Sequence, residues 1–265
     1  MAAKLLLLAR FSLTSAQSAT TPIFCIALSS LSTYTIQSPP SNTGAEPPRT
    51  ASFITSGSGP YPAPMIADSS LPSHIICAPK TPPGGNLSMR FIAWANGACQ
   101  TDGNYYRNFL TEFVSWGHVI SADRAPSAGA GGATNYANID TAKIATTGHS
   151  CGGLEAMSTG YHNTRFMLMM LFDIAIFTDD KRYLLKELKL LHGLLCEKDY
   201  ALLPTGLPAY WASLDTGHQG TYSTTNGGKF GKAAVAHLQW QFSGNTTSKA
   251  ICQDAKAPES LVADN

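Results

Sequence analysis

The sequence predicts one α/β domain in which helices cover both faces of a mostly parallel central sheet. The chain has 265 residues, which is enough for a single large domain with a sizeable core. Short apolar runs alternate with stretches of helical composition, and the runs themselves show little alternation of polar and apolar residues. Strands of that kind are covered on both faces, as in a parallel sheet flanked by helices.

The predicted elements follow one another in β-α-β order. Strands are expected at residues 73–78, 90–94, 117–122, 143–147, 166–172 and 207–214. Helices are expected at residues 104–116, 154–161 and 228–240. In the last of these, Phe230, Ala234 and Leu238 are spaced four residues apart and so share one face.

Both ends of the chain are expected to lie outside this domain. Residues 1–20 resemble a signal peptide, because Lys4 precedes a short apolar run and small residues follow it; a frayed extension is the alternative. Residues 21–56 are rich in Pro, Ser and Thr and predict a linker without packed structure. We expect the domain at 57–245 and a C-terminal tail at 246–265.

Composition excludes several classes of partner. Charged residues make up 13% of the chain and the net charge is +1, and no Lys/Arg run is present, so neither nucleic acid nor an anionic membrane surface is an expected partner. No apolar stretch reaches the roughly eighteen residues that a membrane span needs. We expect a secreted monomer, and the sequons Asn86-Leu87-Ser88 and Asn245-Thr246-Thr247 agree with secretion.

The cysteine pattern argues against a metal site. The six cysteines are widely scattered, with no CxxC pair and no Cys/His cluster of metal-ligand spacing; they are Cys25, Cys77, Cys99, Cys151, Cys196 and Cys252. Secretion would allow one to three disulfides, whose pairing the sequence does not define. The cysteine spacing therefore predicts no structural metal site.

The clearest chemical motif is the G-x-S-x-G sequence around Ser150. An apolar strand ends at Gly148 and a helix-forming segment follows Gly153, which is the strand-turn-helix setting of a nucleophile elbow. The glycines allow the strained turn that such a serine needs. The N–H group of Cys151, at the start of the helix, would face an oxyanion. The sequence therefore predicts the α/β-hydrolase fold with Ser150 as nucleophile.

A serine nucleophile needs a histidine base later in the chain. His218 directly follows a predicted strand and is flanked by Gly217 and Gly220, which suits a loop over the sheet edge, so His218 is the expected base. His192 and His237 lie in a Leu-rich stretch and inside a helix, respectively, and are weaker candidates. His149 is expected to shape the turn.

Small residues after an early strand predict the second oxyanion donor. Ala98 lies in the WANGAC loop that follows the strand at 90–94, and its N–H is the candidate donor. Its neighbour Cys99 either bonds to Cys151 or remains a separate thiol. The aromatic residues Trp94, Tyr105, Tyr106 and Trp211 are candidates to line an apolar acyl pocket, with Trp94 and Tyr105 as the first choices; aromatics also fit the core.

Several motifs together resemble the secreted fungal α/β-hydrolases of the polyester (PET) hydrolase/cutinase-like group, which are related to chlorophyllase and dienelactone hydrolase. They are GSGPYPA, WANGAC, GHSCGG, TDDKRYLLKELK, EKDYALLPTGLPAYWASLDTGH and GGKFGKAAVAHLQW, and they span most of residues 57–265. The resemblance implies hydrolysis of carboxylic esters by a Ser-His-Asp triad without a cofactor. It assigns the nucleophile to Ser150 and the base to His218.

The chain departs from this group at the triad acid. The stretch between Lys189 and Glu197 is too short for the expected strand and acid loop and contains no carboxylate, so the predicted sheet lacks one late strand. Asp173 follows the apolar strand 166–172 and is the first candidate for the acid. Asp199 is a weaker candidate, and Asp179 and Asp180 fit a solvated helix start. The remaining alternative is that no acid serves.

Two functions follow from these observations. The first is a serine esterase that hydrolyses short acyl esters or a cutin-like polyester through Ser150, His218 and an acid. The second is a catalytically impaired member of the fold that binds an apolar ligand or a partner, because the usual acid loop is missing. Peptidase or thioesterase chemistry would use the same triad and differ in pocket shape.

Overall fold

A computed structural model describes most of the chain from residue 56 onward. The described residues are 56–67, 73–85, 87–100, 103–123, 138–176, 179–189, 197–214 and 216–261. The expected signal peptide and all of the expected linker except Ser56 therefore lie outside the described residues, as do Asn86 of the first sequon, His192, Cys25 and Cys196.

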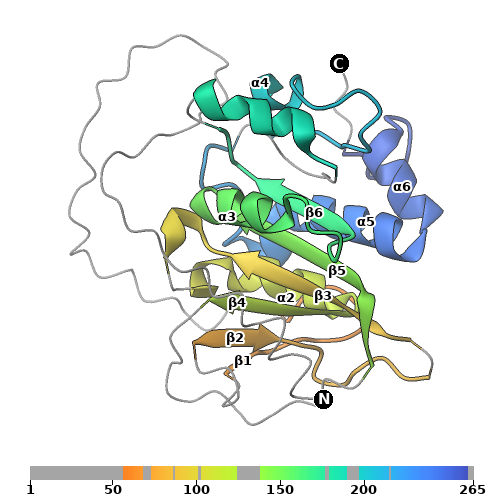
Figure 1. Ribbon diagram of the computed structural model, residues 1–265. Coiled ribbons are helices and arrows are strands. Elements are labelled where there is room, and N and C mark those ends of the chain that lie inside the picture. The colour runs from red at the N-terminus through yellow and green to blue at the C-terminus, as the bar shows by residue number, and fades with distance from the viewer. Residues whose placement is uncertain are drawn as a thin grey trace.

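The protein has an α/β architecture built on a mixed six-stranded sheet (Figure 1). In spatial order the sheet runs β1-β2-β4-β3-β5-β6. The strands are β1 (Met65–Ala67), β2 (His74–Cys77), β3 (Met89–Ala95), β4 (His118–Asp123), β5 (Ile139–His149) and β6 (Leu168–Phe172). The strands β4, β3, β5 and β6 pair in parallel, whereas β1 and β2 join the edge antiparallel. The observed sheet is thus mixed rather than parallel throughout.

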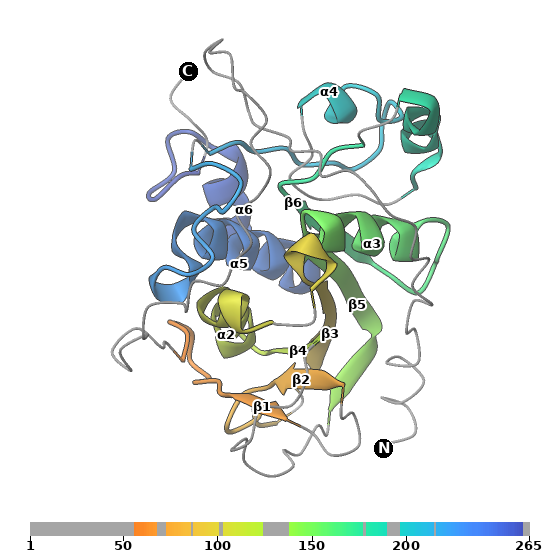
Figure 2. The same cartoon turned by 90° about the vertical axis from the view of Figure 1, so that its left-hand side faces the viewer.

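Helices cover both faces of the sheet, as the sequence predicted. Figure 2 shows α2 (Arg107–Ser115) and α5 (Gly228–Ser243) on one face and α3 (Cys151–Gly160) on the other. The largest core cluster lies beneath α2 and α5 and includes the fully buried Phe109 and Leu238. Strand β6 is buried along its whole length, because helices or loops pack on both of its faces.

Two further helices follow late in the chain. A short helix, α4 (Glu197–Tyr200), precedes the irregular segment that leads to residues 216–220, which contain the predicted base His218 and are called the base loop below. Helix α6 (Thr246–Gln253) packs against α5. Asn245 caps α6 by accepting a hydrogen bond from the N–H of Ser248 at 2.9 Å. The C-terminal tail predicted at 246–265 thus contains an ordered helix with a buried Cys252.

One predicted element is wrong: residues 207–214 form no strand. The segment is irregular and partly exposed, and Pro204 and Pro208 near its start cannot donate to a strand ladder. Tyr210 instead stacks on His237 with ring centroids 5.4 Å apart. In the described part of the chain, β6 is the last strand.

Candidate active site

Ser150 occupies a strained turn at the carboxyl edge of the sheet. It lies between β5, which ends at His149, and α3, which begins at Cys151. Its φ of 54° and ψ of −120° are rare for a residue with a side chain. The turn is held at both ends, because Ser150 N–H donates to the Phe172 carbonyl at 2.9 Å and its carbonyl accepts from Leu154 N–H at 3.2 Å.

The glycines of the motif allow the close packing of this turn. A Cβ atom on Gly148 or Gly152 would collide with the backbone carbonyl of Ala95 at the end of β3. A side chain at either position would therefore push the turn away from the neighbouring strand. The G-x-S-x-G spacing thus serves a backbone contact between β3 and the start of α3.

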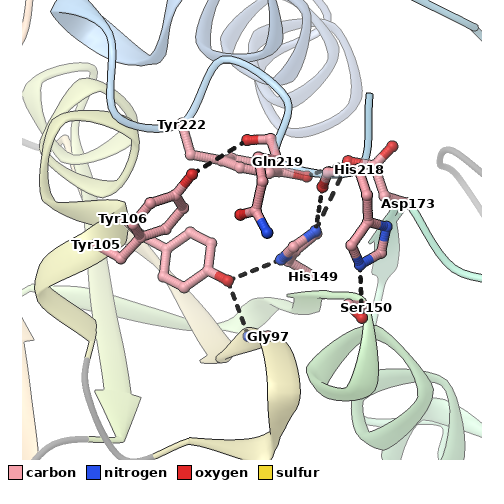
Figure 3. Close-up of polar contacts among 9 residues, drawn as sticks. All are labelled: Gly97, Tyr105, Tyr106, His149, Ser150, Asp173, His218, Gln219 and Tyr222. Carbon is pink, nitrogen blue, oxygen red and sulfur yellow. Dashed lines mark hydrogen bonds and ion pairs between the residues drawn. The ribbon is translucent and has the colours of Figure 1, made fainter. Parts of the chain in front are cut away.

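His218 lies beside Ser150 at this edge of the sheet. Its Nε2 lies 3.0 Å from Ser150 Oγ (Figure 3). Burial holds the pKa of the half-buried imidazole below its usual range. The ring is therefore neutral at neutral pH, and with its proton on Nδ1 it can accept the serine proton through Nε2. The two residues that the sequence assigned as nucleophile and base are brought together.

His149, next to Ser150, links two other segments of the site. Its Nδ1 lies 2.7 Å from Tyr106 Oη, and its Nε2 lies 2.9 Å from the backbone carbonyl of His218. Tyr106 Oη also accepts a hydrogen bond from Gly97 N–H at 3.0 Å. Burial, together with a smaller effect of the nearby His218, lowers the pKa of His149 to about 4. His149 is therefore neutral and bonded at both nitrogens.

Asp173 lies directly after β6, beside these histidines. Its carboxylate accepts a hydrogen bond from Tyr222 Oη at 2.8 Å, and the same oxygen lies 3.8 Å from His149 Nε2. Burial raises the pKa of Asp173 to about 6, and the Tyr222 hydrogen bond opposes that rise. The backbone is left-handed here, with a φ of 50°. Asp173, the first candidate for the acid, thus directs its carboxylate toward His149 and Tyr222.

The other candidate acids are used elsewhere. Asp199 is fully buried and accepts hydrogen bonds from Ile176 N–H at 2.5 Å and Arg182 Nε at 2.8 Å. It therefore braces the segment after β6. Asp179 and Asp180 are exposed at the start of a 3-10 helix, and Asp179 pairs with Arg182. These positions fit the structural alternatives that the sequence allowed.

The two predicted oxyanion loops are covalently joined. Cys99 and Cys151 form a disulfide with their Cα atoms 5.3 Å apart, so the alternative of two separate thiols is wrong. Cys151 is the first residue of α3, and Ala98 lies in the 3-10 turn Gly97–Cys99 with a left-handed φ of 54°. The bridge therefore ties the residue after the nucleophile to the residue after Ala98.

The aromatic candidates for an acyl pocket differ in burial. Trp94 is 4% exposed, lies in the core and donates from Nε1 to Asn96 Oδ1 at 2.9 Å. It thus packs beneath the loop as a core residue, which is the alternative that the sequence left open beside a pocket-lining role. Tyr105 is half-buried, and its hydroxyl donates to the Gln219 carbonyl at 3.4 Å, so it lies beside the base loop. Trp211 is 37% exposed, and its ring centroid is 6.3 Å from that of Tyr200.

The sequence did not indicate the roles of Tyr106 and Tyr222. Tyr106 was one of four aromatic candidates to line an acyl pocket, and Tyr222 had no motif around it. Both are buried, and their rings lie 5.3 Å apart. A signal that could have been used is that buried tyrosine hydroxyls need a hydrogen-bond partner, which often comes from another buried polar group.

Two further features could bind a ligand: a group of possible metal ligands and a cavity. Among the described residues, Cys99, Cys151 and Glu155 are close enough to hold a metal ion, but the two sulfurs are joined in the disulfide. A cavity of about 370 Å³ opens between Ser56, residues 62–65, Lys80 and the first half of α2. None of the residues that line it belongs to the Ser150 site.

Comparisons with known proteins leave the chain without an assigned family. No protein-family model matches the sequence, and no curated protein matches it. Within the part of the chain that the structure describes, none of the helices has the length and apolar character needed to span a bilayer.

Proposed function

We propose that the protein is a serine carboxylic-ester hydrolase of the α/β-hydrolase fold. The observation that carries this proposal is the 3.0 Å contact between His218 Nε2 and Ser150 Oγ on a strained strand-turn-helix elbow. A nucleophile held against a neutral imidazole at the carboxyl edge of a sheet is the arrangement that acyl transfer requires. The chain order, with the nucleophile at 150 and the base at 218, agrees with that fold.

The proposed reaction proceeds in two acyl-transfer steps. Ser150 Oγ attacks the ester carbonyl carbon while its proton passes to His218 Nε2. The negative oxygen that forms accepts hydrogen bonds from the N–H groups of Ala98 and Cys151. The C–O bond to the alcohol then breaks, and His218 returns the proton to the leaving alkoxide. Water repeats the same steps on the acyl-serine and releases the acid.

Asp173 is the proposed acid of the triad. It lies at the carboxyl end of β6 and next to the histidine pair, and its carboxylate would stabilise the imidazolium that forms on His218. Its contacts with Tyr222 at 2.8 Å and His149 at 3.8 Å favour a second candidate function. In that function the protein is a catalytically impaired member of the fold that binds an apolar ligand.

The proposed substrates are short acyl esters or a cutin-like polyester outside the cell. Tyr105 lies beside the base loop and is the aromatic residue best placed to contact the acyl chain. The disulfide between Cys99 and Cys151 is compatible with an oxidising compartment, because disulfides persist in secreted proteins. Ser, His and carboxylate chemistry needs no metal or organic cofactor.

Two measurements on one pair of variants test the proposal. Wild type should react with a fluorophosphonate probe and hydrolyse p-nitrophenyl butyrate, whereas Ser150→Ala should do neither. Ser158→Ala removes an exposed serine from the same helix and should keep both activities, which makes it the matched control. Equal labelling and turnover in wild type and Ser150→Ala would contradict the proposed esterase activity and favour the second candidate function, a catalytically impaired binding protein.

A further inference from the structure

The hydrogen bonds around His149 define a single direction of donation. The Tyr106 hydroxyl accepts from Gly97 N–H at 3.0 Å, so its own proton is available for His149 Nδ1 at 2.7 Å. Nδ1 is then an acceptor, and the proton of the neutral ring lies on Nε2. Nε2 donates that proton to the His218 carbonyl at 2.9 Å, because a carbonyl oxygen only accepts.

This chain of donors connects two segments that are far apart in sequence. Gly97 begins the 3-10 turn that contains Ala98, and His218 lies in the base loop near the end of the chain. Figure 3 shows Tyr106 on one side of His149 and His218 on the other, with Ser150 below. A Cβ on Gly97 would collide with Tyr106 Oη and His149 Nδ1, so the turn packs directly on this chain.

The surroundings keep His149 in one orientation. His149 is only 3% exposed. Its ring centroid lies 4.8 Å from that of His218 and 4.7 Å from that of Tyr222. Rotating the ring would break two hydrogen bonds in a site from which water is largely excluded, and such buried bonds are costly to lose. In the described part of the base loop, Gly220 N–H donates to the Gly217 carbonyl at 3.0 Å and the Gln219 carbonyl accepts from Tyr105 Oη at 3.4 Å, so the 2.9 Å bond from His149 to the His218 carbonyl is the shortest of these three.

The geometry points to His149 as a neutral positioning residue that holds the base loop in register with the oxyanion turn. The inference rests on the proposed function, since the base and the oxyanion donor are defined by it. His149 does not exchange a proton with the substrate. It fixes the backbone of His218 so that Nε2 stays within reach of Ser150 Oγ, and Tyr106 transmits the position of Gly97 to it.

Three variants separate positioning from simple structural support. His149→Phe removes both hydrogen bonds, Tyr106→Phe removes the link to Gly97, and His149→Gln can restore both because its amide accepts and donates. His118→Phe is the matched control, since His118 is another fully buried histidine, located where β4 begins. Thermal unfolding of all four variants identifies any loss that reflects incomplete folding.

The first readout is ester turnover. We expect His149→Phe to lower kcat about 10- to 100-fold with KM within about twofold, because a displaced base slows chemistry without weakening substrate binding. His149→Gln should recover at least about a third of kcat, and Tyr106→Phe added to His149→Phe should cost little more. Equal losses in His149→Phe and His118→Phe would overturn the inference.

The second readout works without catalysis. Hydrogen exchange of the backbone amides at 216–220 should quicken about five- to tenfold in His149→Phe and stay near wild type in His149→Gln and His118→Phe. Unchanged exchange in His149→Phe would overturn the inference even in an active enzyme. Absence of Ser150-dependent turnover in wild type would instead refute the proposed function, and the exchange result would still decide whether His149 holds the loop.

Discussion

Both edges of the central sheet bury a histidine, and the two residues have different surroundings. His149 ends β5 at the carboxyl edge, whereas His118 begins β4 at the amino edge. Burial lowers the pKa of His149 to about 4 and that of His118 to about 3. Both nitrogens of His149 are hydrogen-bonded, whereas within the described residues neither nitrogen of His118 has a hydrogen-bond partner.

The difference shows that a strongly shifted pKa does not by itself identify a functional site. Desolvation is the largest cause of the lowered pKa at both positions. What distinguishes the carboxyl edge is that its polar groups connect separate segments and that strained backbone lies among them, as at Ser150 and Asp173. The predictions below compare changes at that edge with changes elsewhere, from the largest expected effect to the smallest.

Removing the base should have the largest effect on the rate. His218→Ala is expected to lower kcat for p-nitrophenyl butyrate about ten-thousand-fold, because Ser150 then lacks a proton acceptor. Its thermal midpoint should change little, since His218 is only half-buried. The same substitution at the other edge, His118→Ala, should keep kcat and lower the thermal midpoint. If His118→Ala lowered kcat and His218→Ala left it unchanged, the catalytic site would lie away from Ser150 and His218.

Changing the candidate acid should lower the rate strongly. Asp173→Asn is expected to cost about a hundred- to ten-thousand-fold in kcat, because an amide cannot stabilise the imidazolium. Asp199→Asn is not a matched control, since that carboxylate braces Ile176 and Arg182; Asp180→Asn, at an exposed position, is suitable. A kcat equal to that of wild type would remove Asp173 from the triad.

The same substitution should stabilise the protein at neutral pH. The folded-state pKa of Asp173 is raised from 3.8 to about 6, so the native state holds its proton more tightly than the unfolded chain does. Its contribution to the free energy of unfolding is therefore most favourable below about pH 4 and is lost as pH rises through about 6. Asp173→Asn should unfold at a higher temperature than wild type at pH 8 and at a similar one at pH 4. A lower midpoint at pH 8 would contradict this sign.

Breaking the disulfide should have a moderate effect. Cys99→Ser is expected to lower kcat about tenfold by loosening the two oxyanion loops, and to destabilise the fold by about 2–4 kcal/mol, since the bridge closes a loop with a sequence separation of 52 residues. A thiol reductant should reproduce both effects in wild type and should have little further effect on Cys99→Ser. Full kcat in the reduced protein would show that the loops hold their positions unaided.

The Tyr222 hydroxyl should have the smallest effect among these changes. Tyr222→Phe removes the 2.8 Å hydrogen bond to Asp173, and that bond holds the pKa of Asp173 down against burial. The variant should raise the pKa of Asp173 further and lower kcat about two- to fivefold at pH 7. Carbon-13 NMR titration of the Asp173 carboxyl measures the shift, and a lower pKa in the variant would contradict the assigned hydrogen bond.

Most of the sheet, and the contact between Ser150 and His218, could be predicted from the sequence. The apolar runs gave β2 to β6 because fully buried strands need unbroken apolar sequence. The motif around Gly148 and Ser150 predicted the elbow because few other sequences fit such a turn. His218 followed from the chain order and from its flanking glycines.

The remaining features depend on contacts between distant segments. Residues 207–214 have an apolar composition but form no strand, because Pro208 cannot donate to a strand ladder and the segment is partly exposed. The links from Tyr106 to His149 and from Tyr222 to Asp173 join residues 43 and 49 positions apart. No periodicity or motif encodes such side-chain pairs, and the disulfide partner of Cys99 was open for the same reason.

The site of covalent labelling tests the central claim most directly. Wild type and His218→Ala would be treated with a fluorophosphonate, digested, and analysed by tandem mass spectrometry, with the rate of labelling measured in parallel. We predict one phosphonyl group, located on Ser150 Oγ, and a rate that falls at least about a thousandfold in His218→Ala. Labelling spread over several serines, or an equal rate in the two proteins, would contradict the assignment of Ser150 as a nucleophile activated by His218.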